Sequence, residues 1–145
     1  MTSITGRTLQ LGSTLSACAL ILLTASSTAF AGGDKLEAQL FATVSGPLAI
    51  ASGKAKWEED RGRLKASIEV EDVRLLDKTT LTITMCGASA MVMLTTPATG
   101  LGFADLNLDS RNRDMVPACQ AGHKVTVKAT NTNGSETDIL MGTLQ

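Results

Sequence analysis

The residues of this chain that could do chemistry are few, and the most suggestive lie near its one histidine, His123. Met115, Cys119 and His123 stand four residues apart, as in a copper site that combines Cys, His and an axial Met. Such a site needs a second histidine, which the sequence lacks. Ser-His-Asp or Cys-His catalysis would also depend on His123, and Gly87–Met91 lacks the last glycine of a nucleophile elbow. We therefore predict no catalytic residue and no enzyme.

Two metal alternatives stay open beside the main prediction of no bound metal and no cofactor. Asp105, Asp109 and Asp114 could form a calcium site, although their segment lacks the glycine and the closing glutamate of an EF-hand loop. Met91 and Met93 alternate along one apolar run and could bind Cu(I) through their thioethers. Methionine in such a run is more typical of core filling.

Two charge-dense segments are candidate binding loops. The first resembles a solvated hairpin tip, and the second follows an alternating strand pattern. Loops carried by a rigid β scaffold commonly present contact residues. The candidate binding residues are Glu58, Glu59, Asp60, Arg61, Arg63, Arg111, Arg113 and Asp114.

Cysteine usage predicts one disulfide. Cys18 lies in an apolar leader, which leaves Cys86 and Cys119 as the remaining thiols. An exported protein usually oxidises such a pair, and the bridge would contribute on the order of 4 kcal/mol in the chain-entropy model.

The elements that must position these residues are short strands. Val, Thr, Ile and Ala alternate with polar residues in short runs, and turn residues recur about every ten positions, which favours many strands over alternating strands and helices. We expect eight strands, at 36–44, 49–58, 64–73, 79–86, 89–95, 102–109, 123–130 and 136–144.

The second and third of these strands form a hairpin whose register can be predicted. Pairing Trp57 with Ala66 places Glu58 opposite Lys65, and it leaves residues 60–63 as the loop. A shift by two residues would place like charges opposite one another, which is destabilising.

Two further expectations concern turns and strand position. Asn133-Gly134 favours a tight hairpin turn with positive φ at both residues. The run 90–94 is apolar on both sides, so we expect it to be a central strand covered on both faces.

The first 31 residues have the order of parts of a cleavable signal peptide. Arg7 precedes an apolar stretch that ends in the small residues around Ala31, after which we expect cleavage. The apolar stretch is too short for a permanent span, so no membrane span is expected in the mature chain. A lipoprotein anchored through Cys18 is the alternative, but the apolar residues follow that cysteine instead of preceding it. The remainder, residues 32–145, is long enough for a single domain.

The near-neutral composition, with a formal net charge of −1, gives no electrostatic footprint for nucleic acid. In the segments 53–56, 68–72, 106–113, 116–117 and 121–127 the chain resembles small exported bacterial all-β proteins. The resemblance covers most of residues 48–145. It implies a sandwich-like domain and lends no catalytic residues.

We accordingly expect an all-β, antiparallel β-sandwich of immunoglobulin-like type with about eight strands. The expected function is a non-enzymatic binding or structural module, secreted or periplasmic, whose partner is a protein or an envelope component. A metal-binding protein for calcium or copper is the alternative, and a hydrolytic enzyme is the second alternative.

Overall fold

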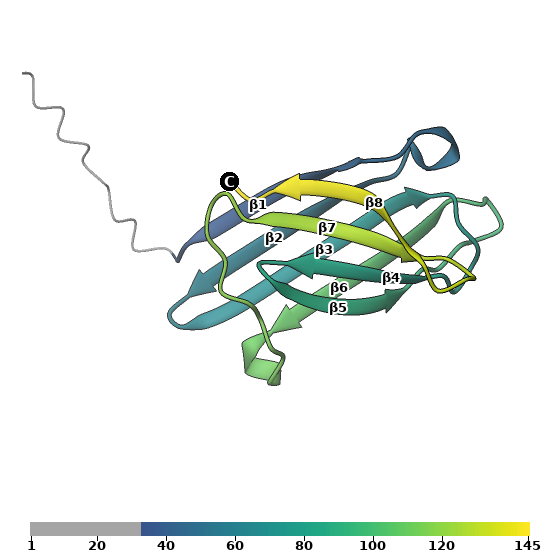
Figure 1. Cartoon of the computed structure of the whole chain (residues 1–145). Helices are drawn as coiled ribbons and strands as arrows, with labels where there is room; N and C mark the ends of the chain where they lie inside the picture. Colours follow the sequence, from purple (N-terminus) through teal and green to yellow (C-terminus); the bar gives the residue numbers. More distant parts are fainter. Residues whose placement is uncertain (1–32) are drawn as a thin grey trace, which may run out of the picture.

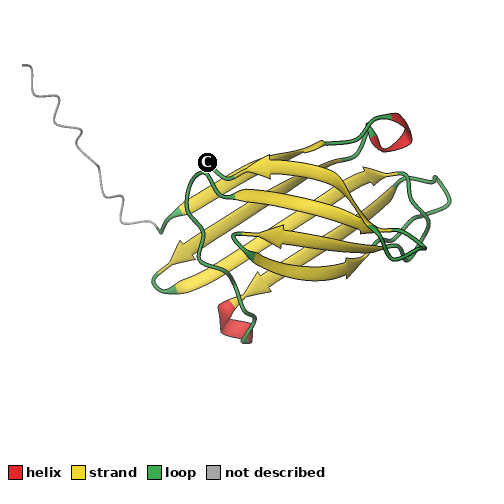
Figure 2. Cartoon of the chain, viewed as in Figure 1, coloured by secondary structure: helices red, strands yellow, loops and turns green. Residues whose placement is uncertain are grey.

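The computed structural model describes residues 33–145, which form eight antiparallel strands and two short 3-10 helices (Figure 2). The all-β prediction and the positions of all eight predicted strands are confirmed to within a few residues. The elements are β1 (Lys35–Ala42), η1 (Gly46–Leu48), β2 (Ser52–Asp60), β3 (Arg63–Val73), β4 (Thr80–Met85), β5 (Ala88–Met93), β6 (Gly102–Asp109), η2 (Ser110–Asn112), β7 (Lys124–Thr130) and β8 (Glu136–Thr143).

The eight strands belong to one continuous sheet in the order β5-β4-β7-β8-β1-β2-β3-β6. The sheet curls until its two end strands approach each other, which gives a nearly closed barrel (Figure 1). Thr95, just after β5, and Phe103, in β6, exchange two backbone hydrogen bonds of 2.9 Å. The immunoglobulin-like sandwich is not confirmed, because every strand pairs with the next one in this order, from β5 at one end of the sheet to β6 at the other.

Alternation along the strands places one apolar face of the sheet inside the barrel, as expected for period-two side chains. Trp57 is only 3% exposed, and Leu40, Ile68 and Ile83 are each 1% exposed. The predicted register of β2 and β3 is confirmed, with Trp57 opposite Ala66. On the outer face of this hairpin, Glu58 therefore lies opposite Lys65, which is the pairing of opposite charges on which the predicted register was based.

Both hairpin turns differ in detail from the prediction. β2 and β3 extend to Asp60 and Arg63, so the turn holds only Arg61 and Gly62, both with positive φ. The β7–β8 hairpin is present, but only Gly134 has positive φ there. Its N–H donates to Asn131 O at 2.9 Å, the pattern of a type I turn followed by one left-handed residue.

The expectation of a central, doubly covered strand at residues 90–94 is wrong. β5 lies at one end of the sheet order, and Met91 and Met93 are 77% and 69% exposed. Only the inward side chains of the strand contact the core. A strand that is apolar on both sides was assumed to be buried on both sides, and here one apolar side faces outward.

The predicted leader, residues 1–31 with Cys18 and Ala31, lies outside the described residues. Across residues 33–145, the structure contains no helix of the length and apolar character that crossing a membrane requires.

Candidate functional site

The two charge-dense segments lie together at one end of the barrel (Figure 1). The β2–β3 turn presents Arg61, whose side chain is 93% exposed. β6 is the antiparallel neighbour of β3, so the final residues of β6 lie beside the start of β3. η2 follows directly after these final residues. The antiparallel ladder therefore brings two segments into one surface although about 50 residues separate them in the sequence.

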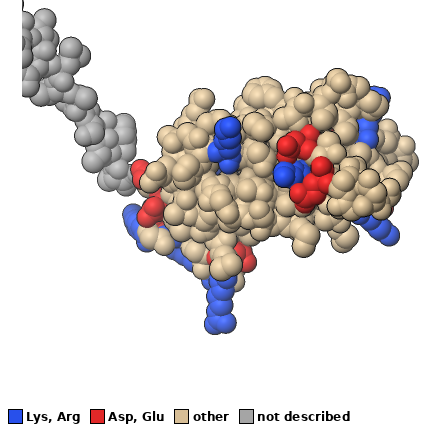
Figure 3. All heavy atoms as spheres, in the orientation of Figure 1, with Lys and Arg blue, Asp and Glu red and all other residues tan. Residues whose placement is uncertain are grey.

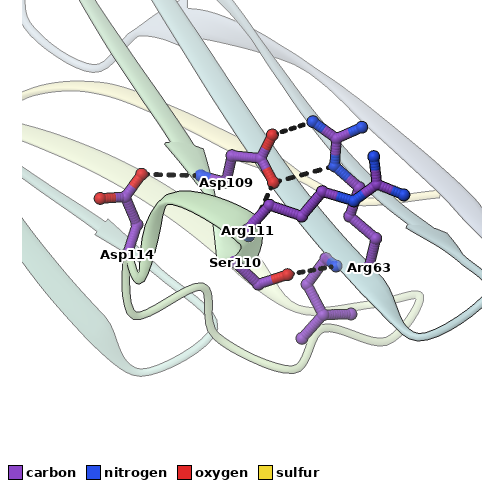
Figure 4. A network of polar contacts seen from close by, with 6 residues as sticks. Arg63, Asp109, Ser110, Arg111 and Asp114 are labelled. Atoms are coloured by element: carbon purple, nitrogen blue, oxygen red, sulfur yellow. Dashed lines mark hydrogen bonds and ion pairs between the residues drawn. The ribbon is translucent and has the colours of Figure 1, made fainter.

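An ion pair between Arg63 and Asp109 joins the two segments (Figure 4). The Arg63 Nε donates to Asp109 Oδ1 at 2.9 Å, and its Nη2 donates to Oδ2. The backbone N–H of Leu64 donates to Ser110 Oγ at 3.0 Å. A two-bonded guanidinium–carboxylate pair fixes orientation as well as distance, so the hairpin and η2 are held as one unit.

Asp109 also caps η2. Its Oδ1 accepts from the backbone N–H of Arg111 at 3.0 Å, and its own N–H donates to Asp114 Oδ2 at 2.9 Å (Figure 4). Arg113 ends the helix with a φ of 68°. The side chains of Arg111 and Arg113 are exposed to solvent. The neighbouring acids, Asp109 and Asp114, accept hydrogen bonds within the protein.

The protonation of the pair follows from this geometry. The Arg63 guanidinium, which donates to the Asp109 carboxylate, holds the pKa of that carboxyl far below its ordinary value of 3.8. The N–H of Arg111 acts in the same direction. Hydrogen bonding to Asp109 in turn raises the pKa of Arg63. The ion pair therefore stays charged over the whole physiological range.

A polar hollow of about 410 Å³ lies next to this ion pair, on the outer face of β2, β3 and β6. Lys56 and Lys65 supply positive charge to its wall, and Glu58 supplies negative charge. Asn107 and Asn112 add amides that can donate and accept hydrogen bonds. The hollow suits a polar, hydrogen-bonding group of either charge.

The predicted disulfide is present at the same end of the barrel. Cys86 and Cys119 are bonded, with their Cα atoms 5.4 Å apart. The ligand atoms of these two cysteines and of His123 lie within 4.8 Å of one another, and they are the one such group of three among residues 33–145. The disulfide uses both sulfurs, so a metal could bind to all three residues only in the reduced protein.

The three acids of the calcium alternative are partly engaged elsewhere. Asp109 is bound to Arg63, and Asp114 accepts from a backbone N–H. Asp105 lies four residues back along β6, opposite Glu69. A calcium ion would have to compete with the Arg63 guanidinium for Asp109.

Sequence reasoning missed three residues of this end. Ser110 and Asn112 lie between predicted residues but carry no charge that draws attention to them. Pro117 accepts a hydrogen bond of 2.9 Å from the buried Trp57 Nε1, which ties the loop after η2 to the core. A lone buried tryptophan needs a partner for its N–H, and that requirement was the one available signal.

The comparisons with known proteins give no relative. No protein-family model matches the sequence, and searches of curated proteins and of solved structures return no significant match.

Proposed function

We propose that this chain is a non-enzymatic binding module that contacts a protein or envelope component through the surface formed by residues 58–63 and 111–114. Immunoglobulin-like sandwiches use end loops in this way, and we propose the same use for this curled sheet. The observation that carries the proposal is the Arg63–Asp109 pair, which joins two exposed segments that are distant in sequence.

The chemistry of the surface supports contact with a partner. Arg61, Arg111 and Arg113 are exposed on the two segments that the ion pair joins, and arginine is enriched at energetically important positions of protein interfaces. A rigid support lowers the entropy that ordering these side chains would cost on binding. Arginine donors match carboxylates best, so we propose an acidic group on the partner.

An extracytoplasmic location is part of the proposal. The disulfide is typical of proteins in an oxidising compartment. Together with the signal-like order of residues 1–31, it supports secretion to the periplasm or the medium.

The test removes the exposed guanidinium groups and leaves Arg63 in place. We expect the immobilised wild-type protein to retain a component of the source cell's envelope. The immobilised double variant Arg111→Ala, Arg113→Ala should not retain this component. Alanine at 113 has the same Cβ as arginine, so the positive φ adds no new strain there. Thermal denaturation should give an unchanged Tm.

The matched control is Arg74→Ala, an exposed arginine in the β3–β4 loop at the other end of the barrel. It should retain the same component as the wild type. If the double variant binds as well as this control, residues 111–114 are not part of the binding surface.

A further inference from the structure

The two end strands of the sheet, β5 and β6, face each other across an incomplete junction, here called the seam. The mutual hydrogen bonds of Thr95 and Phe103 close it at one end. Beyond that bridge, no ladder joins β5 to β6 in the described part of the chain. The seam therefore opens toward the end of the barrel that carries η2 and the disulfide.

The backbone of β5 leaves hydrogen-bonding groups directed into the seam. In an antiparallel ladder, alternate residues bond to the same neighbour. Leu94 bonds to Thr79 on the β4 side, and Thr95 bonds to Phe103 on the other. By the same alternation, the N–H and C=O groups of Met91 and Met93 point into the seam, where residues 33–145 offer them no partner.

The edge of β6 that faces the seam also has unpaired backbone groups. Phe103 already bonds across the seam, so alternate residues Asp105 and Asn107 direct their backbone groups the same way. Neither has a backbone partner on that side among the described residues. Asp109 is the exception, because its N–H is bound by Asp114. Two unpaired strand edges thus lie opposite each other.

The floor between these edges is apolar. A cavity of about 350 Å³ lies in the open part of the seam, with Ile68 and Ile83 at its base. Leu106 and Leu108 line one wall, and Met115 stands at the mouth with 92% of its surface exposed. An alternating apolar strand would bury its inward side chains against this floor.

The two edges differ in charge. β5 contains no charged residue, and Figure 3 shows few charged side chains over β4 and β5. Natural proteins usually protect an open edge with lysine, proline or a bulge, and the sequence of β5 has no lysine or proline. β6 carries Asp105 on its outer face. An incoming strand would therefore meet negative charge on one side only.

We propose that the seam binds an extended peptide segment of a partner protein, with apolar side chains facing inward and basic ones outward. Strand addition to an open edge supplies main-chain hydrogen bonds, and alternate pockets supply specificity. The β5 strand of a second copy fits less well, because β4 of that copy already occupies one of its edges. An occupant of the seam needs both edges free. This site adjoins the surface formed by residues 58–63 and 111–114, here called the arginine surface, because Asp114 belongs to that surface and also lines the cavity.

The probe is an acetylated and amidated peptide, Lys-Val-Thr-Val-Lys-Ala-Thr, which copies the inward-apolar, outward-basic pattern of β7. Added to the oxidised protein at millimolar concentration, it should slow amide hydrogen exchange at Met91 and Asn107, which lie farther from the Thr95–Phe103 bridge than Met93 and Asp105 do, measured by NMR. A peptide with glutamate in place of both lysines should bind more weakly, because it meets Asp105.

Two variants test the contact. Met91→Pro removes a seam donor without removing a bond to β4, and the loss of one hydrogen bond should weaken binding about five-fold. Asp105→Lys should reverse the preference between the two peptides, and it depends on no backbone change. An unchanged Tm would show that each variant is folded.

Three outcomes overturn the proposal. The first is no change in exchange at the Met91 and Asn107 amides with either peptide. The second is protection that persists unaltered in both variants. The third is protection that depends on protein concentration without peptide, since the seam would then be an interface between copies.

Discussion

At the scale of single residues, Asp109 organises the candidate surface. It pairs with Arg63 from the neighbouring strand, and it accepts the Arg111 N–H at the start of η2. A carboxylate with two donors of this kind is stabilised in its charged form. Loss of its charge would therefore loosen both the hairpin and the helix that presents the exposed arginines.

This gives a prediction for acid. The pKa of Asp109 is lower in the folded chain than its ordinary value of 3.8, so its ionisation stabilises the fold above that value. The stabilisation is lost as pH falls toward the folded pKa. We expect the free energy of unfolding of the wild type, from urea titrations, to decline below about pH 5.

Asp109→Asn should be less stable than the wild type at pH 7, and its stability should decline less steeply in acid. Asp105→Asn, on the same strand but outside the ion pair, is the control and should retain the wild-type slope. Equal slopes for Asp109→Asn and the wild type would contradict the role assigned to the ion pair.

At the scale of elements, the eight strands could be predicted because alternation is a local property of each segment. The position of a strand in the sheet is not local. Residues 90–94 would have suited a central strand, yet β5 is an end strand. The charged segments were likewise visible in the sequence, whereas the Arg63–Asp109 pair depends on the pairing of β3 with β6, which no local pattern specifies.

Gly53 shows a constraint of the same scale, since β2 passes close to both of its neighbours there. A Cβ at this position would lie 2.5 Å from Glu69 O on β3 and 3.2 Å from Leu40 Cδ1 on β1. We expect Gly53→Ala to lower the free energy of unfolding by about 1–3 kcal/mol, as overpacking commonly does.

Urea denaturation would measure the effect. Ser52→Ala, one residue earlier with its side chain on the other face, should change the free energy of unfolding by no more than about 0.5 kcal/mol. If both variants matched the wild type, the strands would be able to separate at this point without cost.

At the scale of the whole molecule, the long segment between η2 and β7 crosses the end of the barrel that carries both proposed sites. Asp114 holds its start through the Asp109 N–H, and Pro117 O accepts from Trp57. Cys119 joins it to the β4–β5 turn. The segment thus connects the arginine surface, the mouth of the seam and the core.

The disulfide should therefore affect global stability and the order of this segment together. A bridge with a sequence separation of 33 residues stabilises by about 4 kcal/mol in the chain-entropy model. We expect the double variant Cys86→Ser, Cys119→Ala to lose a similar amount, which corresponds to a fall in Tm of about 15 °C. Amide exchange at residues 113–122 should accelerate more than exchange in β2 and β3.

Wild-type protein reduced with dithiothreitol should match the variant, because both lack the same covalent bond. An unchanged Tm with unchanged exchange at 113–122 would mean that the Trp57 hydrogen bond and the Asp114 contact suffice to hold the segment.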